Sequence, residues 1–170
     1  MAEQAQGGPG WVVLFVCSGN TCRSPMAAAF FNLLAEKKGL SLRAESAGIA
    51  PFEEGASYEA VQAATDYGAD LSSHKTRQLK EAELREAERV ITMTETHKQR
   101  LEQSFALASG RVFTLMESVD GSGDIYDPYL KPLTVYRNCA AQIWAAVGKL
   151  VDRLAKEAKD VHGLPATKAP

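Results

Sequence analysis

A short segment near the N-terminus most constrains this chain, because it joins an expected strand to an expected helix through residues that carry chemistry. Residues 11–16 (WVVLFV) are continuously apolar and rich in β-branched and aromatic side chains, which is typical of a strand buried on both faces. The sequence CSGNTCRSP follows, from Cys17 to Pro25. Ser24 is a favoured helix N-cap residue and Pro25 a favoured first helical residue, so the segment predicts a tight turn from strand into helix.

This turn offers the surroundings that phosphate chemistry needs. Its backbone N–H groups converge at a helix N-terminus and together attract an anion. A helix N-terminus and a neighbouring cation also favour the thiolate form of a cysteine, so Cys17 is a candidate nucleophile. Arg23 can hold two phosphoryl oxygens in its planar fork, and Ser24 can donate its hydroxyl to the sulfur of Cys17. We expect phosphoryl transfer to sulfur, followed by hydrolysis of a phosphocysteine.

Blander interpretations of the same segment compete with this one. A buried cysteine is most often a small packing residue, and an arginine after a loop is most often a solvated charge. Neither explains why Cys17 and Arg23 stand together with a Gly-Asn pair, a second cysteine and a Ser-Pro cap. A nucleotide-binding loop of the Walker type is disfavoured because the Gly-Lys-Ser/Thr ending is missing.

Patterns typical of strands and helices alternate along the rest of the chain. One helix is expected at residues 25–38, ended by Gly39, and another from Ser57, ended by Gly68. Further strands are expected at 40–44, 89–93 and 111–115, and further helices at 80–87, at 94–103 with Thr94 as its cap, and at 134–159. This alternation predicts an α/β fold with a parallel sheet, which places ligands at the carboxyl ends of its strands.

The segment CSGNTCRSP resembles the signature loop of the low-molecular-weight protein phosphatase family, whose pattern is C-x-G-N-x-C-R-S-P. Residues 46–48 (SAG), 74–79 (HKTRQL) and 124–129 (DIYDPY) resemble, in the family's order, its S-A-G turn, its H-x-A-R-Q segment and its general-acid loop. The resemblance covers about residues 11–158. It implies a three-layer sandwich with a four-stranded parallel sheet flanked by helices and a phosphate-binding loop after the first strand.

The resemblance also implies roles for individual residues. Cys17, Arg23 and Asp127 would be catalytic, and Ser46 and His74 would support the loop. Asn20 is expected in a left-handed backbone conformation, which asparagine tolerates. By resemblance its side chain would be tied to Ser24, Ser46 and His74. The residues expected to bind substrate are Ser18, Gly19, Asn20, Thr21, Cys22, Ser24, Phe52 and Tyr129.

A long connection at residues 116–133 contains the expected general acid, Asp127. A leaving group needs a proton as its bond to phosphorus breaks, and water later needs a base, so one carboxyl can serve both steps. The alternative is that Asp-Pro merely initiates a turn. Asp120 and Asp124 are nearby rivals, and Asp124 is expected to support the loop.

The histidines and cysteines give no sign of a metal or a cofactor. His97 and His162 lack a supporting context, and no cluster of metal-binding residues is visible. Cys22 either forms a reversible disulfide with Cys17 under oxidants or only packs against the sheet, and Cys139 is expected in the core. The expected cofactor and metal content is therefore none.

Composition agrees with one small enzyme domain. A chain of 170 residues with 45% hydrophobic residues can bury one core, and a net charge of −2 argues against nucleic-acid partners. No targeting or membrane segment is apparent, and the odd cysteine number fits a cytoplasmic protein. We expect a flexible extension at 1–10, a phosphatase domain at 11–158 and a flexible tail at 159–170. The expected partners are a phosphorylated protein and the product inorganic phosphate, with neither nucleic acid nor membrane.

The substrate class stays open between branches of the family. Thr21 stands where the tyrosine-specific branch commonly has isoleucine and thus resembles the protein arginine phosphatase branch, as do residues 93–98 (MTETHK) and 112–115 (VFTL). Phe52 and the TRQL run at 76–79 resemble the tyrosine-directed enzymes, and Leu130-Lys131 replaces glycines common after the acid loop. We expect a protein arginine phosphatase, with a protein tyrosine phosphatase as the alternative.

Two further interpretations are less favoured. An arsenate reductase needs two more mid-chain cysteines, and none lies between Cys22 and Cys139. A non-catalytic phosphate-binding module would not need the set of Cys17, Arg23 and Asp127.

Overall fold

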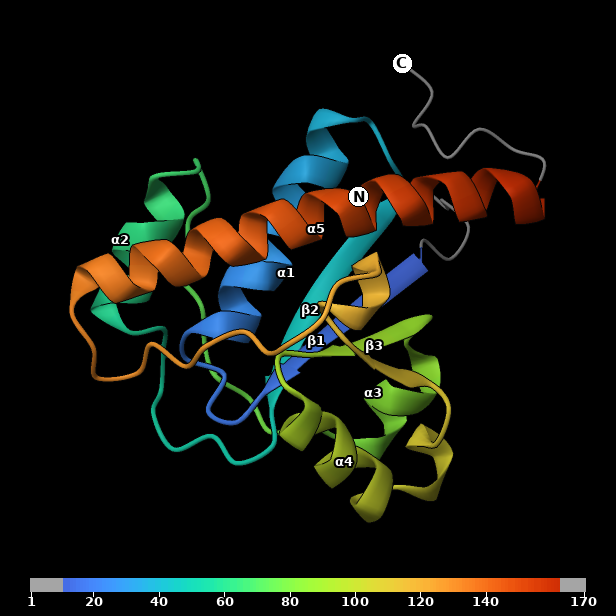
Figure 1. Cartoon of the computed structure of the whole chain (residues 1–170), viewed down its shortest axis with the longest axis horizontal. Coiled ribbons are helices and arrows are strands. Elements are labelled where there is room, and N and C mark those ends of the chain that lie inside the picture. Colours follow the sequence, from blue (N-terminus) through green and yellow to red (C-terminus); the bar gives the residue numbers. More distant parts are fainter. Residues whose placement is uncertain (1–10, 163–170) are drawn as a thin grey trace, which may run out of the picture.

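A computed structural model describes residues 11–162 of the chain (Figure 1). The predicted extension at 1–10 and residues 163–170 of the predicted tail lie outside the described residues. In chain order the elements are β1 (Trp11–Cys17), α1 (Arg23–Lys37), β2 (Leu42–Gly48), α2 (Tyr58–Thr65), α3 (Glu81–Glu86), β3 (Arg89–Thr92), α4 (Glu95–Ser104), β4 (Val112–Thr114) and α5 (Leu133–His162), with short 3-10 turns at Ala106–Ala108 and Glu117–Val119.

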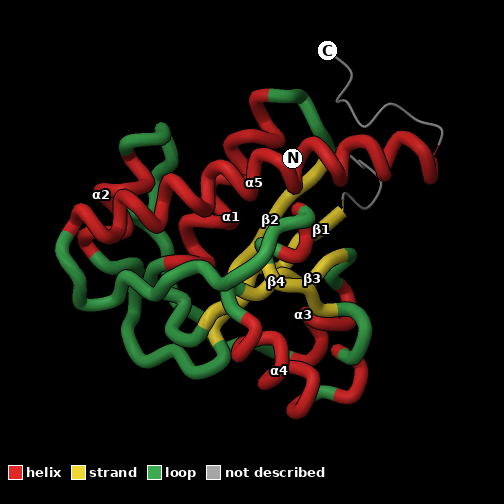
Figure 2. The backbone as a smooth tube through the Cα atoms, in the orientation of Figure 1, coloured by secondary structure: helices red, strands yellow, loops and turns green. Residues whose placement is uncertain are grey.

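The four strands form one parallel sheet in the order β2-β1-β3-β4 (Figure 2). Strand β1 is central, so Val13 pairs with Ala44 on one side and with Arg89 on the other. The prediction of a parallel α/β sheet with four strands is confirmed. Because β1 has a neighbour on each side, Cys17 leaves the sheet near its middle.

Helices cover both faces of the sheet and give the molecule its three layers (Figure 1). Val13 and Phe15 belong to the larger core beneath α1 and α5, whereas Leu14 and Val16 belong to the smaller core beneath α3 and α4. These four side chains of β1 are at most 1% exposed. Each fully buried apolar side chain of this size contributes about 1.5–3 kcal/mol, which anchors the strand that carries Cys17.

Most element ends differ by a residue or more from the sequence predictions, and three elements illustrate the differences. Strand β2 occupies Leu42–Gly48 rather than 40–44, because its pairing with β1 continues until Gly48 lies opposite Cys17. Helix α1 begins at Arg23, and Ser24 is not its cap as predicted, because the Ser24 hydroxyl is engaged with Cys17 and Asn20 instead. Helix α5 ends at His162, three residues beyond the predicted end.

The predicted start of a helix at Ser57 and the predicted cap at Thr94 are confirmed. Ser57 accepts a hydrogen bond from the Ala60 N–H at the start of α2, and Thr94 accepts one from the His97 N–H at the start of α4. Both satisfy backbone donors that a helix N-terminus leaves unpaired. Within residues 11–162, no helix has the length and apolar character needed to cross a bilayer.

Candidate active site

The loop from Cys17 to Arg23 surrounds a small cavity at the carboxyl end of β1. The cavity has a volume of about 70 Å³ and is lined by Cys17, Ser18, Gly19, Thr21, Cys22, Arg23, Phe52, Asp127 and Tyr129. The structure therefore brings the three expected catalytic residues together, along with six of the eight expected substrate-binding residues. The other two, Asn20 and Ser24, are completely buried behind the loop.

Cys17 and Ser24 are joined by a direct hydrogen bond between their side chains. The Ser24 Oγ lies 2.9 Å from the Cys17 Sγ, and it also accepts a hydrogen bond of 2.9 Å from the Asn20 Nδ2. Because the amide of Asn20 can only donate there, the Ser24 hydroxyl proton is free to point at the sulfur. Ser24 is thus oriented to donate to a thiolate at Cys17.

Asn20 ties the loop to two distant segments of the chain. Its φ of 56° is left-handed, as predicted, and its side chain is fully buried. Its Nδ2 donates to the Ser46 Oγ at 2.9 Å, and its Oδ1 accepts from the Arg77 N–H at 3.2 Å. The His74 Nε2 lies 2.8 Å from the Asn20 carbonyl oxygen. All three expected partners are therefore within hydrogen-bond distance of Asn20: Ser24 and Ser46 through its side chain, and His74 through its backbone carbonyl.

His74 carries its ring proton on the nitrogen that faces the loop, because a carbonyl oxygen only accepts hydrogen bonds. Burial lowers the pKa of His74, the bond to Asn20 opposes that shift, and the nearby Arg77 guanidinium adds to it. The neutral imidazole is the form that these surroundings favour.

The S-A-G turn ends in glycine because there is no room for a side chain at Gly48. A Cβ at this position would lie 2.8 Å from the Ser18 carbonyl oxygen and 3.1 Å from the Asn20 Cβ. The next two residues donate backbone hydrogen bonds to the loop, Ile49 to the Cys17 carbonyl and Ala50 to the Ser18 carbonyl. The end of β2 therefore fits closely against the phosphate loop.

Arg23 spans the distance between the loop and the connection that contains Asp127. It is 5% exposed, its Nη1 donates to the Ile125 carbonyl at 3.0 Å, and its Nη2 lies 3.3 Å from the Asp127 Oδ2. The other carboxylate oxygen of Asp127 accepts the Tyr129 N–H at 3.2 Å. The side chain of Asp127 is 56% exposed, which leaves it open to exchange protons with water.

The two rival carboxylates lie outside the cavity lining. Asp124 accepts the backbone N–H of Glu95 at 2.8 Å, at the N-terminus of α4, in agreement with its expected role in supporting the loop. Asp120 pairs with Arg153 of α5. Among the three, only Asp127 can reach a group bound in the cavity.

Aromatic side chains form the rim of the cavity. Phe52 is 70% exposed and meets the ring of Tyr129 edge to face, with 5.8 Å between ring centroids. The Tyr129 hydroxyl donates to the Glu53 Oε1 at 2.6 Å, and this bond raises the pKa of Tyr129. Leu130 follows with a φ of 58° and 83% exposure, a left-handed conformation in place of the family's glycine.

His97 is a residue of this site that sequence analysis missed. Its Nε2 lies 2.9 Å from the Ser18 Oγ, and the side chain is 4% exposed. Burial is the main reason that its pKa falls to about 4, and the Arg23 guanidinium adds to the effect. The sequence held a usable signal, because His97 lies in the first turn of the helix that Thr94 caps, directly after β3. The carboxyl ends of parallel strands share one edge of the sheet, so this helix start is expected near the loop that follows β1.

The three cysteines are all free and buried. The Cys22 Sγ lies within 3.5 Å of hydroxyls from Thr21, Ser57 and Tyr136. Cys139 is part of the larger core, as predicted, and burial raises the pKa of its thiol to about 12. In the described part of the chain, no group of three or more His, Cys, Asp or Glu side chains could hold a metal ion.

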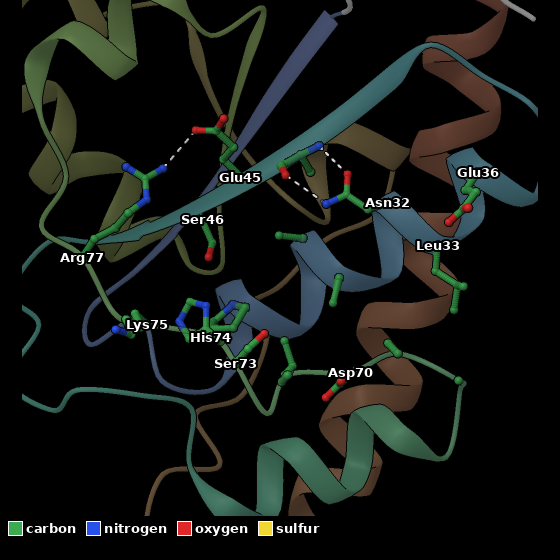
Figure 3. A pocket seen from close by; sticks show the side chains of 17 residues that line it. Asn32, Leu33, Glu36, Glu45, Ser46, Asp70, Ser73, His74, Lys75 and Arg77 are labelled. Carbon is green, nitrogen blue, oxygen red and sulfur yellow. Dashed lines mark hydrogen bonds and ion pairs between the residues drawn. The ribbon is translucent and has the colours of Figure 1, made fainter. Parts of the chain in front are cut away.

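A larger cavity of about 520 Å³ lies between α1 and residues 68–77 (Figure 3). Ser46 and His74 form part of its wall, but Cys17, Arg23 and Asp127 do not line it. Several polar groups there already have partners: Asn32 binds both backbone groups of Ala44, and Arg77 pairs with Glu45 (Figure 3). This cavity therefore lies behind the loop supports and is not the place where Cys17 acts.

Known proteins resemble the chain over nearly all of its described length. The family model of low molecular weight phosphotyrosine protein phosphatase matches residues 12–160. A protein-arginine-phosphatase from Bacillus subtilis is 37% identical over 147 residues, which cover 85% of this chain and 97% of that protein.

Solved structures share the fold, among them the two described next. A low molecular weight protein tyrosine phosphatase from T. tengcongensis has a TM-score of 0.81 and 39% identity, covering 84% of this chain and 99% of that one. A mutant of the arginine phosphatase YwlE with a phosphorylated active-site serine has a TM-score of 0.82 and 35% identity, covering 87% and 98%.

Proposed function

The chain belongs to the low molecular weight phosphotyrosine protein phosphatase family, and on that premise we propose that it hydrolyses phosphoarginine in proteins through a phosphocysteine at Cys17. The observation that carries this proposal is the hydrogen bond of 2.9 Å between Cys17 and Ser24, in a cavity that Asp127 also lines. A sulfur nucleophile, its hydroxyl partner and a carboxyl group then face one bound phosphoryl group. The proposed domain is 11–158.

In the first step, the Cys17 thiolate attacks phosphorus and the bond between phosphorus and the leaving nitrogen breaks. Asp127, in its protonated form, gives its proton to that nitrogen as the bond breaks. The Arg23 guanidinium and the N–H groups of the loop hold the phosphoryl oxygens and neutralise the negative charge on them. The products of this step are the free arginine side chain and a phosphocysteine.

In the second step, water attacks the phosphocysteine. The Asp127 carboxylate, now ionised, takes the proton from water, and the bond between sulfur and phosphorus breaks. The departing thiolate accepts a hydrogen bond from the Ser24 hydroxyl, which stabilises it as a leaving group. Inorganic phosphate is released, and both Cys17 and Asp127 return to their starting forms.

Thr21 supports the choice of phosphoarginine. Its side chain lines the cavity, is 4% exposed, and has its Oγ1 3.4 Å from the Cys22 Sγ. A hydroxyl at this place can pair with a guanidino N–H next to phosphorus, whereas the branched apolar side chain of isoleucine cannot. The similarity to a protein-arginine-phosphatase from Bacillus subtilis supports the same choice.

A protein tyrosine phosphatase is the second candidate, and one observation favours it. Phe52 and Tyr129 meet edge to face at the rim, where a flat phenyl ring could pack against them. The same family includes the tyrosine phosphatase from T. tengcongensis. In either case the proposed partner is a phosphorylated protein, and the free thiols support a cytoplasmic location.

The deciding experiment compares two peptides of one sequence that differ only in the phosphorylated residue. We expect kcat/KM for the phosphoarginine peptide to exceed that for the phosphotyrosine peptide by about tenfold or more. Cys17→Ser is the matched control, and it should fold and bind phosphate but turn over neither peptide. A preference for phosphotyrosine would establish the second candidate instead, and turnover by the serine variant near the wild-type rate would refute the nucleophile.

A further inference from the structure

His97 stands directly behind the residue that follows the nucleophile. Helix α4 presents its ring to the phosphate loop, where Nε2 lies 2.9 Å from the Ser18 Oγ. The other ring nitrogen, Nδ1, is the one buried side-chain nitrogen or oxygen without a hydrogen-bond partner among the side chains that the structure describes, residues 12–160. The charged groups that act on the ring are Arg23, Asp127, Arg100 and Asp124. The sequence predicts no role for His97, and the proposed reaction does not use it.

The unpartnered nitrogen decides which tautomer the ring adopts. A neutral imidazole has one N–H and one bare nitrogen. If Nδ1 held the proton, a buried N–H would lack an acceptor, which is unfavourable. If Nε2 holds it, Nδ1 leaves only a lone pair unused, and buried groups with an unused lone pair are commoner than orphaned N–H groups. The geometry therefore favours the proton on Nε2, facing Ser18.

That tautomer fixes the direction of the Ser18 hydroxyl. An Nε2–H donates to the Ser18 Oγ, so the hydroxyl proton of Ser18 must find another acceptor. Ser18 lines the same small cavity as Cys17 and Asp127. The acceptors that the proposed reaction brings there are the oxygens of a phosphoryl group.

We infer that His97 is a positioning residue of the reaction: it donates to Ser18 and so aims the Ser18 hydroxyl proton at a phosphoryl oxygen. This inference rests on the proposed function. With the proton on Nδ1, Ser18 would instead donate to His97 and would have no proton for the substrate. The two tautomers leave the same heavy atoms in contact, but only the Nε2–H tautomer leaves the Ser18 hydroxyl proton free for the substrate.

The first test uses substitutions that differ in reach. The amide nitrogen of glutamine reaches about as far as Nε2 of histidine, whereas that of asparagine stops near Nδ1. We expect Ser18→Ala and His97→Asn each to lower kcat/KM for para-nitrophenyl phosphate about tenfold or more, the scale of a hydrogen bond to a charged acceptor. His97→Gln should recover most of what His97→Asn loses. Gln103→Asn, an exposed change on the same helix, is the control.

A double substitution tests whether His97 acts through Ser18. In the combined Ser18→Ala and His97→Asn protein, we expect kcat/KM and the inhibition constant of vanadate to match those of Ser18→Ala alone. Thermal unfolding of each variant shows which are folded and comparable. Additive losses, or equal losses in His97→Gln and His97→Asn, would overturn the role of His97.

Nitrogen NMR of the imidazole gives a readout that does not depend on turnover. At pH 7 we expect the shifts of a ring protonated on Nε2, with and without vanadate, and a ring protonated on Nδ1 would overturn the inference. A wild-type protein that hydrolyses no phosphate ester or phosphoarginine would overturn the proposed function, whereas an active wild type with the Nδ1 tautomer would overturn only the part played by His97.

Discussion

Arg23 and Asp127 form an ion pair across the cavity, with 3.3 Å between Nη2 and Oδ2, although one begins α1 and the other lies in the connection before α5. The guanidinium is almost fully buried and the carboxylate is more than half exposed. A phosphoryl dianion competes with Asp127 for the same nitrogen. Binding of the phosphoryl group therefore frees the carboxyl to face the leaving group.

Asp127→Asn should slow turnover of substrates with poor leaving groups by roughly 10²–10⁴-fold, the usual scale for losing a general acid. The loss should be smaller for an aryl phosphate whose leaving group needs little protonation. Rates measured over a series of aryl phosphates of graded leaving-group pKa check this. Asp124→Asn is the control, because Asp124 binds the Glu95 N–H outside the cavity, and its loss should not vary along the series. Uniform loss in Asp127→Asn would assign that residue to loop support alone.

Thr21→Ile should change which substrate is preferred. The substitution nearly conserves volume but removes the hydroxyl, and a lost hydrogen bond to a charged partner costs about 1.5–3 kcal/mol. We expect kcat/KM to fall for phosphoarginine and to hold or rise for phosphotyrosine, so that the ratio moves at least about tenfold. The phosphotyrosine peptide is the internal control. An unchanged ratio would make Thr21 a packing residue and favour the tyrosine phosphatase.

Leu130→Gly should stabilise the protein. A non-glycine residue in the left-handed region costs roughly 1–2 kcal/mol, which glycine avoids, although glycine also gains entropy in the unfolded chain. Leu130 is 83% exposed, so little packing is lost. We expect the free energy of unfolding, measured in urea, to rise by about 0.5–1 kcal/mol. Lys131→Gly, next to it but without a left-handed φ, should not stabilise the protein, and equal effects at both positions would contradict the argument.

Stability should fall as the pH drops because of His97. Its pKa is lowered to about 4 in the folded protein, below the ordinary value of 6.5, so the unfolded chain binds more protons between these values. The stability that the folded protein gains from keeping His97 neutral is fully present above pH 6.5 and is lost as the pH falls toward 4. A shift of this size is worth about 3 kcal/mol. Urea unfolding at pH 7.5 and pH 4.5 should show a smaller drop in His97→Gln than in wild type, and equal drops would contradict it.

Gly48→Ala should damage catalysis more than stability. The added Cβ would lie 2.8 Å from the Ser18 carbonyl oxygen, so the loop must shift, and misplacement of reacting groups by about 1 Å costs on the order of 10²-fold in rate. Gly148→Ala, within α5, adds a Cβ to open space and should leave kcat unchanged while raising stability slightly. The comparison of kcat and unfolding free energy in these two variants separates a loop effect from a general one.

The loop and the sheet could be predicted from sequence because their signals are local. The apolar run of β1 and the turn residues that follow it determine where Cys17, Arg23 and Ser24 stand, and the alternation of patterns predicts parallel strands. The predicted hydrogen bond between Ser24 and the Cys17 sulfur is present, but the N-cap role predicted for Ser24 was wrong, because its hydroxyl is engaged by Cys17 and Asn20 and not by the helix terminus.

Contacts between distant segments could not be predicted in the same way. Ser18 and His97 are 79 residues apart, and the link between Glu53 and Tyr129 spans 76. No sequence spacing predicts either contact, because the relative position of the elements involved depends on how the whole sheet is assembled. The left-handed Leu130 was visible only as a departure from the family's glycines.

The central place of β1 has a consequence for how the protein acquires its activity. Parallel strands cannot pair through a short hairpin, so β1 must find Ala44 and Arg89 across intervening helices before the sheet is complete. Such long-range pairing makes folding slow compared with helical bundles of this size. Asn20 depends in addition on Ser46 and His74, so catalytic competence emerges at the end of folding, and recovery of turnover reports the native state rather than an early collapsed one.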